Sequence, residues 1–133
     1  MKKALLIIFL LLVTFGASAE VYKYKTTEFA YRTLNSRGYW NDWSSWEESS
    51  MLIVINTNAD KVDIYSPTPQ HYDIIEYGEK ESDGQGGKMF TLSCVDADGS
   101  RCNIRTRIQK DGQMQLYVDY SDASWVYNIH FKY

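Results

Sequence analysis

The chain has 133 residues, 44% of them hydrophobic and 15% aromatic, with a formal net charge of −3. That length fits one domain of common size with a self-sufficient core. An acidic chain without a basic stripe is poorly suited to nucleic acid or to an anionic lipid surface, so neither is expected as a partner.

The N-terminal segment has the pattern of a cleavable secretory signal peptide. Lys2 and Lys3 give a positive start, 4–13 is an uninterrupted apolar run, and Ala-Ser-Ala at 17–19 is a typical signal-peptidase exit. The apolar run is shorter than the roughly 20 residues that cross a bilayer as a helix, which argues against a membrane anchor. The sequence therefore predicts removal of residues 1–19 and export to the periplasm or the cell exterior.

Cleavage leaves a single predicted domain, residues 20–133. Loss of Lys2 and Lys3 reduces the 14 basic residues to 12 against 17 acidic ones, a net charge of −5. Cys94 and Cys102 remain, and two cysteines in an oxidising compartment are expected to be joined. We therefore predict a disulfide between them.

The pattern of this domain is that of an all-β protein. Valine, isoleucine, threonine and aromatic residues gather in short alternating runs separated by Asn, Asp, Gly and Pro. The predicted strands cover 21–31, 49–56, 61–66, 71–77, 88–96, 101–109, 113–120 and 125–132. We expect an antiparallel meander of about eight strands, curled into a small up-and-down barrel of lipocalin-like architecture, with a two-sheet β-sandwich as the alternative.

Three hairpins in the second half have a predictable register. Loops 97–99 and 110–112 both end in glycine, as a type I turn closed by a left-handed residue requires. These loops set Cys94 opposite Cys102, Leu92 opposite Ile104, Ile108 opposite Met114, and Ile104 opposite Val118. A four-residue loop, 121–124, then sets Tyr120 opposite Trp125 and Leu116 opposite Ile129. One face stays apolar through four strands, and the two cysteines meet on it.

The usual signatures of catalysis and metal binding are missing from the sequence. His71 and His130 have no neighbours with the spacing of a metal site. Glu47 and Glu48 are adjacent, and neighbours on a strand point to opposite faces, which does not suit acid and base work on one substrate. We predict no enzymatic activity, no metal and no cofactor.

The most unusual segment is an aromatic cluster in which three tryptophans follow one another at three-residue steps. It contains Tyr39, Trp40, Trp43 and Trp46. Clustered indoles form platforms for sugars or enclose an apolar ligand, and their N–H groups supply polar contacts. We take these four residues as candidate ligand contacts, with the alternative that they plug the open end of the barrel. The polar, glycine-rich loop 78–87 is expected to be a solvated hairpin end, with a lid over a pocket as the alternative.

The last strand, 125–133, resembles the terminal strand of bacterial outer-membrane barrels, because it alternates apolar and polar residues up to an aromatic C-terminus. That resemblance implies an apolar outer face against lipid and a polar lumen. The lumen would then be lined by Asn103, Arg105, Arg107, Gln115 and Asp119. Several predicted strands are shorter than the roughly 9 to 11 residues that a membrane strand needs, so membrane insertion is not expected.

Three features together resemble small exported bacterial β-proteins of unknown function: the tryptophan cluster, the apolar strand 51–55 and the Cys94–Cys102 hairpin. The resemblance implies export and a β fold but no activity. The leading functional hypothesis is an exported, non-enzymatic binding module for a small apolar ligand or a glycan. The alternatives are a protein–protein interaction or inhibitor protein of the cell envelope, and a small outer-membrane barrel.

Overall fold

The computed structural model describes residues 21–132, and the predicted signal peptide, 1–19, lies outside the described residues. The described part of the chain folds entirely into strands and connecting loops, without a helix. The strands are β1 (Val21–Thr33), β2 (Glu47–Glu48), β3 (Leu52–Asn56), β4 (Lys61–Tyr65), β5 (Gln70–Tyr77), β6 (Glu81–Ser82), β7 (Lys88–Asp96), β8 (Arg101–Ile108), β9 (Met114–Asp119) and β10 (Ala123–Phe131). The eight predicted strands are all present, and the short strands β2 and β6 are additional.

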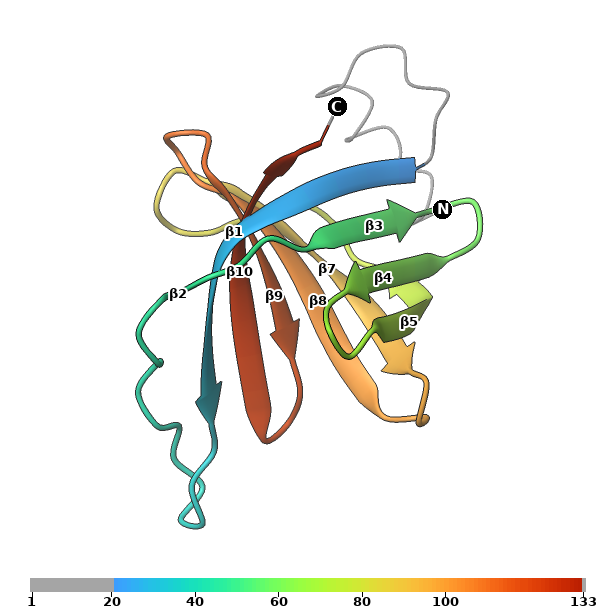
Figure 1. Ribbon diagram of the computed structural model, residues 1–133. Coiled ribbons are helices and arrows are strands. Elements are labelled where there is room, and N and C mark those ends of the chain that lie inside the picture. Colours follow the sequence, from blue (N-terminus) through green and yellow to red (C-terminus); the bar gives the residue numbers. More distant parts are fainter. Residues whose placement is uncertain (1–20, 133) are drawn as a thin grey trace.

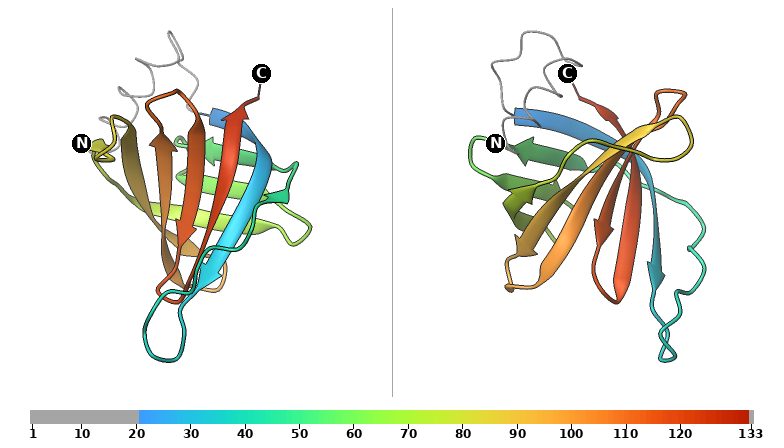
Figure 2. Two further views of the ribbon diagram at one scale, coloured as in Figure 1. Left: turned by 90° about the vertical axis from the view of Figure 1, so that its left-hand side faces the viewer. Right: turned by 180° about the vertical axis from the view of Figure 1, so that it is seen from behind.

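Eight of these strands form a closed antiparallel barrel (Figures 1 and 2). Their order is β10-β9-β8-β7-β5-β4-β3-β1, and β1 pairs in turn with β10. β2 pairs along β1 and β6 along β7, outside this circuit. The predicted up-and-down barrel is confirmed, and the two-sheet sandwich is wrong, because pairing of the first and last strands leaves one continuous sheet.

The up-and-down order gives the barrel two distinct ends. We call the end that holds Val21 and Phe131 the terminal end, at the top of Figure 1. The opposite end, which we call the mouth end, collects the loops after β1, β4, β7 and β9. Loops that are far apart in the sequence therefore meet at the mouth end.

Alternation along the strands fills the barrel interior with apolar side chains. Leu92, Ile104, Leu116 and Val118 are fully buried, and the aromatic and aliphatic residues of the other strands pack around them. The charged and amide side chains of β8 and β9, including Arg105 and Arg107, lie on the outer face, and Thr106 is a polar residue on the inner face. This is the reverse of the polar lumen that the membrane-barrel alternative requires. No helix in residues 21–132 has the length and apolarity to cross a membrane.

The registers of the first two predicted hairpins are confirmed, and that of the third is wrong by two residues. Ile104 pairs with Val118 as predicted, whereas Leu116 pairs with Tyr127 rather than with Ile129. The reason is a tighter turn, in which the backbone N–H of Tyr120 donates to the carbonyl of Ala123 over 2.8 Å. A shift of two residues preserves the inward face, so the apolar pattern survives the error.

Cys94 and Cys102 lie directly opposite each other on β7 and β8, as predicted. Both are buried free thiols, so the predicted disulfide is absent from the structure. The backbone N–H of Asp96 donates to the carbonyl of Ser100, which by alternation makes the cysteines a hydrogen-bonded pair. Side chains in such a pair stand farther apart than in the non-hydrogen-bonded pairs, which is consistent with two separate thiols.

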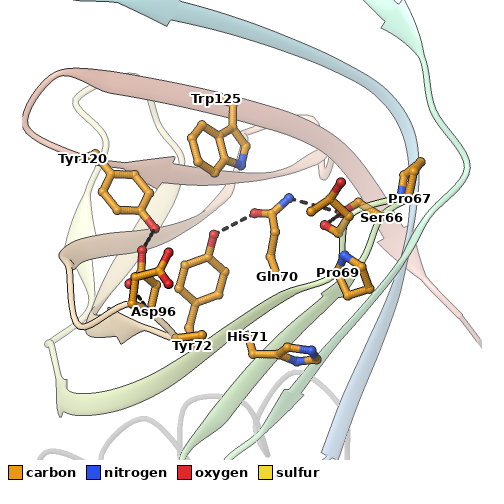
Figure 3. A pocket seen from close by; sticks show the side chains of 12 residues that line it. Ser66, Pro67, Pro69, Gln70, His71, Tyr72, Asp96, Tyr120 and Trp125 are labelled. Carbon is orange, nitrogen blue, oxygen red and sulfur yellow. Dashed lines mark hydrogen bonds between the residues drawn. The ribbon is translucent and has the colours of Figure 1, made fainter.

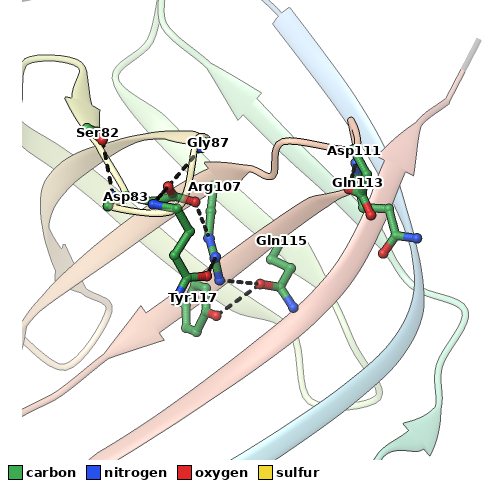
Figure 4. Close-up of polar contacts among 10 residues, drawn as sticks. Ser82, Asp83, Gly87, Arg107, Asp111, Gln113, Gln115 and Tyr117 are labelled. Atoms are coloured by element: carbon green, nitrogen blue, oxygen red, sulfur yellow. Dashed lines mark hydrogen bonds and ion pairs between the residues drawn. The ribbon is translucent and has the colours of Figure 1, made fainter.

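The loop 78–87 forms a hairpin end whose centre is the Asp83 carboxylate (Figure 4). This carboxylate accepts the backbone N–H groups of Gln85 at 2.7 Å and Gly87 at 2.8 Å, and pairs with Arg107 at 3.0 Å. A Cβ at position 87 would stand only 2.6 Å from the backbone carbonyl oxygen of Ile108 and 2.3 Å from Asp83 Oδ2, so glycine is required there. The hairpin lies at the terminal end, away from the mouth end of the barrel.

Candidate functional site

A cavity of about 500 Å³ opens at the mouth end of the barrel (Figure 3). Its lining comes from the β4–β5 loop 66–69, the start of β5, the β7–β8 loop and the β9–β10 hairpin. Below it, the interior is closed by the packed core. The site is therefore a cup at one end of the barrel rather than a channel through it.

Strand alternation and turn chemistry place the side chains of this cup. Along β5, Tyr72 is buried, whereas His71 is exposed, lines the cavity as well, and has its Nδ1 2.5 Å from Asp63 Oδ1. Asp96 ends β7, and its Oδ1 accepts the backbone N–H groups of Asp98 and Ser100, both at 2.9 Å. An aspartate bonded to the backbone two residues ahead is a common way to fix a turn.

Two aromatic rings form one wall. The rings of Tyr120 and Trp125 lie 5.5 Å apart between centroids at an interplanar angle of 32°. The indole Nε1 of Trp125 is buried, and the Trp125 side chain interacts with the hydroxyl of Tyr127, whose pKa is raised by burial and partly lowered by this contact. The wall thus presents apolar ring surface to the cavity, and the indole N–H is withdrawn from it.

Gln70 organises the polar side of the cup. The hydroxyl of Tyr72 donates to Gln70 Oε1 at 2.6 Å, and Gln70 Nε2 donates to Ser66 Oγ at 3.5 Å (Figure 3). Gln70 Nε2 also donates to the hydroxyl of Tyr127 at 3.3 Å. The amide is therefore held between the barrel interior and the β4–β5 loop. Its orientation is set before any ligand arrives, which lowers the entropic cost of binding.

Asp96 supplies the negative charge of the cup. The hydroxyl of Tyr120 donates to Asp96 Oδ2 at 2.7 Å, and this bond, followed by the backbone N–H of Ser100, lowers the pKa of the carboxyl. Burial raises the pKa of Tyr72 and, together with the Asp96 carboxylate, that of Tyr120. At neutral pH the site therefore presents an ionised carboxylate beside two protonated phenols.

The predicted ligand residues Tyr39, Trp40, Trp43 and Trp46 do not line this cup. They belong to a segment, 39–46, that we call the aromatic arm, which runs back along the lower half of β1 (Figure 1). The structure brings Trp40 and Trp43 together around Arg32, whose guanidinium carbon lies 4.6 Å from each ring centroid. Tyr39 and Trp46 stay exposed, at 70% and 45%.

The aromatic arm covers the outer wall of the barrel, so the alternative that it plugs the open end is wrong. Ala30 and Val126 point outward but are only 2% and 3% exposed. Val126 pairs with Tyr117, and the ring of Tyr117 meets Trp43 edge-on at 6.3 Å. Trp43 therefore shields a small apolar area outside the barrel.

Sequence reasoning missed the cup because its residues are distributed over 66–72, 96–98 and 120–125. None of these segments matches a known motif. The predicted meander itself held one signal, because every second loop of an up-and-down barrel lies at the same end of the barrel. The loops after β4, β7 and β9 could therefore have been grouped, and the grouping would have placed Asp96, Tyr120 and Trp125 together.

No protein-family model matches this chain, and no curated protein and no solved structure is significantly similar to it.

Proposed function

We propose that the protein is a non-enzymatic binding module that holds a small ligand, namely a glycan unit or a molecule of similar size with an apolar face, in the mouth cup. The observation that carries this proposal is the 500 Å³ cavity with an aromatic wall and a fixed polar side. Ligand pockets are commonly about 300–1,000 Å³ and combine apolar walls with a few oriented polar groups.

The chemistry of the walls favours a sugar over a purely apolar ligand. The face of a sugar ring packs on an indole, and its hydroxyls both donate and accept hydrogen bonds. In the cup, Trp125 offers a ring, Gln70 an amide, and Asp96 a carboxylate. A hydrocarbon leaves these polar groups without partners, which costs free energy.

Nuclear magnetic resonance of the ¹⁵N-labelled protein tests this proposal, because the chain has 4 tryptophans and each gives one indole N–H signal. Trp125→Phe identifies the signal from the cup. A monosaccharide of roughly 12 non-hydrogen atoms at about −0.3 kcal/mol per atom binds with a Kd in the millimolar range, which sets the titration range.

The expected result is a saturable shift of the Trp125 signal with at least one member of a panel of neutral and charged sugars. Shifts confined to Trp40, Trp43 or Trp46 would move the site to the aromatic arm. A panel of sugars and short-chain lipids that moves none of the four signals contradicts the proposed function.

A second candidate function is docking of another protein on the aromatic arm. Several large aromatic side chains are exposed between 31 and 46, and tryptophan, tyrosine and arginine are the residues that dominate binding energy at protein interfaces. Size-exclusion chromatography of the purified protein, alone and with Trp46→Ala, tests self-association through this surface. A monomer at high concentration in both samples removes self-association from consideration.

We also propose that the protein is exported after cleavage at the end of the predicted signal peptide. The sequence pattern of residues 1–19 supports this proposal. Expression of the full chain in a bacterial host, followed by fractionation and N-terminal sequencing, is expected to give a mature form that begins at Glu20. Full-length chain in the cytoplasmic fraction contradicts it.

A further inference from the structure

We propose that the ligand of the mouth cup is an oligosaccharide of at least two units, whose second unit packs on the exposed ring of Tyr31 beside the cup. The inference rests on the proposed function and deepens it from one sugar unit to a chain of them. It follows from the direction of the Tyr31 side chain, from its exposure, and from the polar groups next to it.

Tyr31 lies on the same face of the sheet as the aromatic wall of the cup. It pairs across β1 and β10 with Trp125, which lines the cavity. Phe29, two residues earlier on β1, pairs with Tyr127, and their rings pack in the barrel interior at 6.4 Å between centroids. Because side chains two residues apart on a strand share a face, Tyr31 points to the same side as Phe29.

The pairing brings the side chains of Tyr31 and Trp125 close together. The backbone N–H of Leu34 donates to the carbonyl of Asp122 at 2.9 Å, which by alternation makes Tyr31 and Trp125 a non-hydrogen-bonded pair. Side chains stand closer in such a pair, with Cβ atoms about 4.5–5.5 Å apart. The ring of Tyr120 lies against Trp125 from the β9–β10 hairpin (Figure 3). Three aromatic side chains therefore follow one another from this hairpin to β1.

The fold makes little use of the Tyr31 ring. Tyr22 and Tyr24 point inward from the first half of β1 and are 5% and 2% exposed, whereas Tyr31 is 50% exposed. Tyr31 is not among the residues that line the cup, so its ring extends the aromatic surface beyond the 500 Å³ cavity. A ligand held in the cup reaches this ring by extending past Trp125.

A polar pair lies next to the Tyr31 ring. Thr33 is the next residue on the same face of β1, and the side-chain amide of Asn41 donates to its hydroxyl oxygen at 3.1 Å. Both residues are exposed. Within residues 21–132, this contact leaves the Thr33 hydroxyl free to donate and Asn41 Oδ1 free to accept. The second place thus combines a ring with a donor and an acceptor, as the hydroxyls of a sugar require.

The aromatic arm fixes the position of Asn41. Trp40 and Trp43 flank it in the sequence, and the guanidinium carbon of Arg32 lies 4.6 Å from each of their ring centroids. The backbone N–H of Asn41 also donates to the carbonyl of Thr33 at 2.9 Å. Asn41 is therefore held in place before a ligand arrives, which lowers the entropic cost of binding. The tryptophans of the arm then serve binding indirectly, by positioning Asn41.

A chain of sugars matches this arrangement better than one sugar or a hydrocarbon. Each place offers a ring for the face of a sugar and an amide for its hydroxyls. The cup supplies Trp125 and Gln70, and the surface beside it supplies Tyr31 and Asn41. One sugar unit uses only one of the two places. A hydrocarbon that covers both leaves their polar groups without partners, which costs free energy.

Titrations with matched monosaccharides and disaccharides test the inference on the wild-type protein. The pairs are glucose with cellobiose, glucose with maltose, N-acetylglucosamine with diacetylchitobiose, and galactose with lactose. We expect at least one disaccharide to shift the Trp125 indole signal with a Kd about tenfold below that of its monosaccharide, the upper end of one aromatic contact. That disaccharide is also expected to move the side-chain amide signal of Asn41, which its monosaccharide leaves in place. Asn41→Ser identifies this signal.

Variants of two exposed tyrosines locate the second place. Tyr31→Ala is expected to remove the gain of the disaccharide and to leave the Kd of the monosaccharide unchanged, with the fold verified by circular dichroism. Tyr31→Phe keeps the ring and is expected to keep the gain. Tyr65, on β4, is 49% exposed, close to the 50% of Tyr31. Tyr65→Ala is therefore the matched control, and it is expected to leave the gain intact.

The outcomes keep this inference distinct from the proposed function. Equal affinity of every disaccharide and its monosaccharide overturns the oligosaccharide inference and leaves the binding function standing. A gain that survives Tyr31→Ala, or an Asn41 amide signal that stays in place when the disaccharide binds, overturns the location. Silence of the Trp125 signal with all of these sugars and with the wider panel overturns both proposals.

Discussion

Two aspartates each organise a loop at one end of the barrel. Asp83 holds the loop 78–87 through the backbone N–H groups of Gln85 and Gly87 and through Arg107. Asp96 holds the β7–β8 loop through Asp98, Ser100 and Tyr120. The pKa of both carboxyls is lowered, for Asp83 first by the Gln85 backbone N–H and for Asp96 first by the Tyr120 hydroxyl.

These lowered pKa values make part of the stability depend on pH. A carboxyl whose native pKa lies below its unfolded value of about 3.9 stabilises the fold above that pH, and the contribution disappears as the pH falls through the lowered native pKa. The urea midpoint is therefore expected to fall between pH 5 and about pH 2. Asp83→Asn is expected to flatten this acid dependence. A midpoint that is constant over this range would show that the two carboxylates do not contribute.

The buried thiols give a second prediction at this scale. Burial raises the pKa of Cys94 to about 12 and that of Cys102 to about 11. Because the thiolate is the reactive form, the reduced native protein is expected to react with iodoacetamide at pH 8 roughly a hundredfold more slowly than the denatured protein. Mass spectrometry of timed samples measures both rates. Equal rates would place the thiols in contact with solvent.

The accuracy of the sequence prediction also varied from residue to residue. Gly99 and Gly112 adopt positive φ angles of 85° and 89°, and their presence fixed two loops and two registers correctly. The β9–β10 turn at Ser121 and Asp122 has no glycine to mark its length. A two-residue turn and a four-residue loop then both match the apolar alternation of β9 and β10. The predicted pairing of these two strands was therefore wrong by two residues.

Among the elements, β1 is the strand with the most varied neighbours. Its first residues pair with β3, and its lower half pairs with β10 on one side and with β2 and the aromatic arm on the other. A bulge between Thr26 and Glu28 marks the change. Bulges bend a strand and increase its twist, which lets β1 leave β3 and continue along β10.

The aromatic arm is held on β1 by the stack of Arg32 between Trp40 and Trp43. Arg32→Ala is expected to destabilise the protein by about 1–2 kcal/mol, since it removes two cation–π contacts. Arg32→Lys keeps the charge without the planar group and is expected to be intermediate. Urea unfolding measures the loss, and tryptophan fluorescence reports release of the arm. An Arg32→Ala protein with unchanged stability and fluorescence would contradict a role for the stack.

The candidate site was harder to predict than the strands that carry it. The spacing of Trp40, Trp43 and Trp46 identified an unusual segment but not the wall that it covers, because the partner of that segment, Arg32, lies on a different element. The cup depends on contacts such as Gln70 with Tyr127, which are 57 residues apart. The alternation of apolar and polar residues along a single strand does not predict contacts between residues so far apart in the sequence.

At the scale of the whole molecule, closure joins the two ends of the described chain. Phe29 on β1 pairs with Tyr127 on β10, and β1 with β10 make the most extensive strand contact of the barrel. Folds dominated by pairings distant in sequence fold slowly, in about milliseconds to seconds. Stopped-flow refolding from urea is expected to give a relaxation in this range. Complete refolding within microseconds would show that closure is not limiting.

The separation of the two barrel ends has a practical consequence for any assay that attaches the protein to a surface. Val21 and Lys132 lie together at the terminal end, where the backbone N–H of Lys132 donates to the carbonyl of Lys23 at 3.0 Å, while the cup opens at the other end. An affinity tag, a biotin or a fusion partner at either end of residues 21–132 therefore leaves the cup facing the solution. Immobilised protein can be screened against glycan arrays with the cup unobstructed.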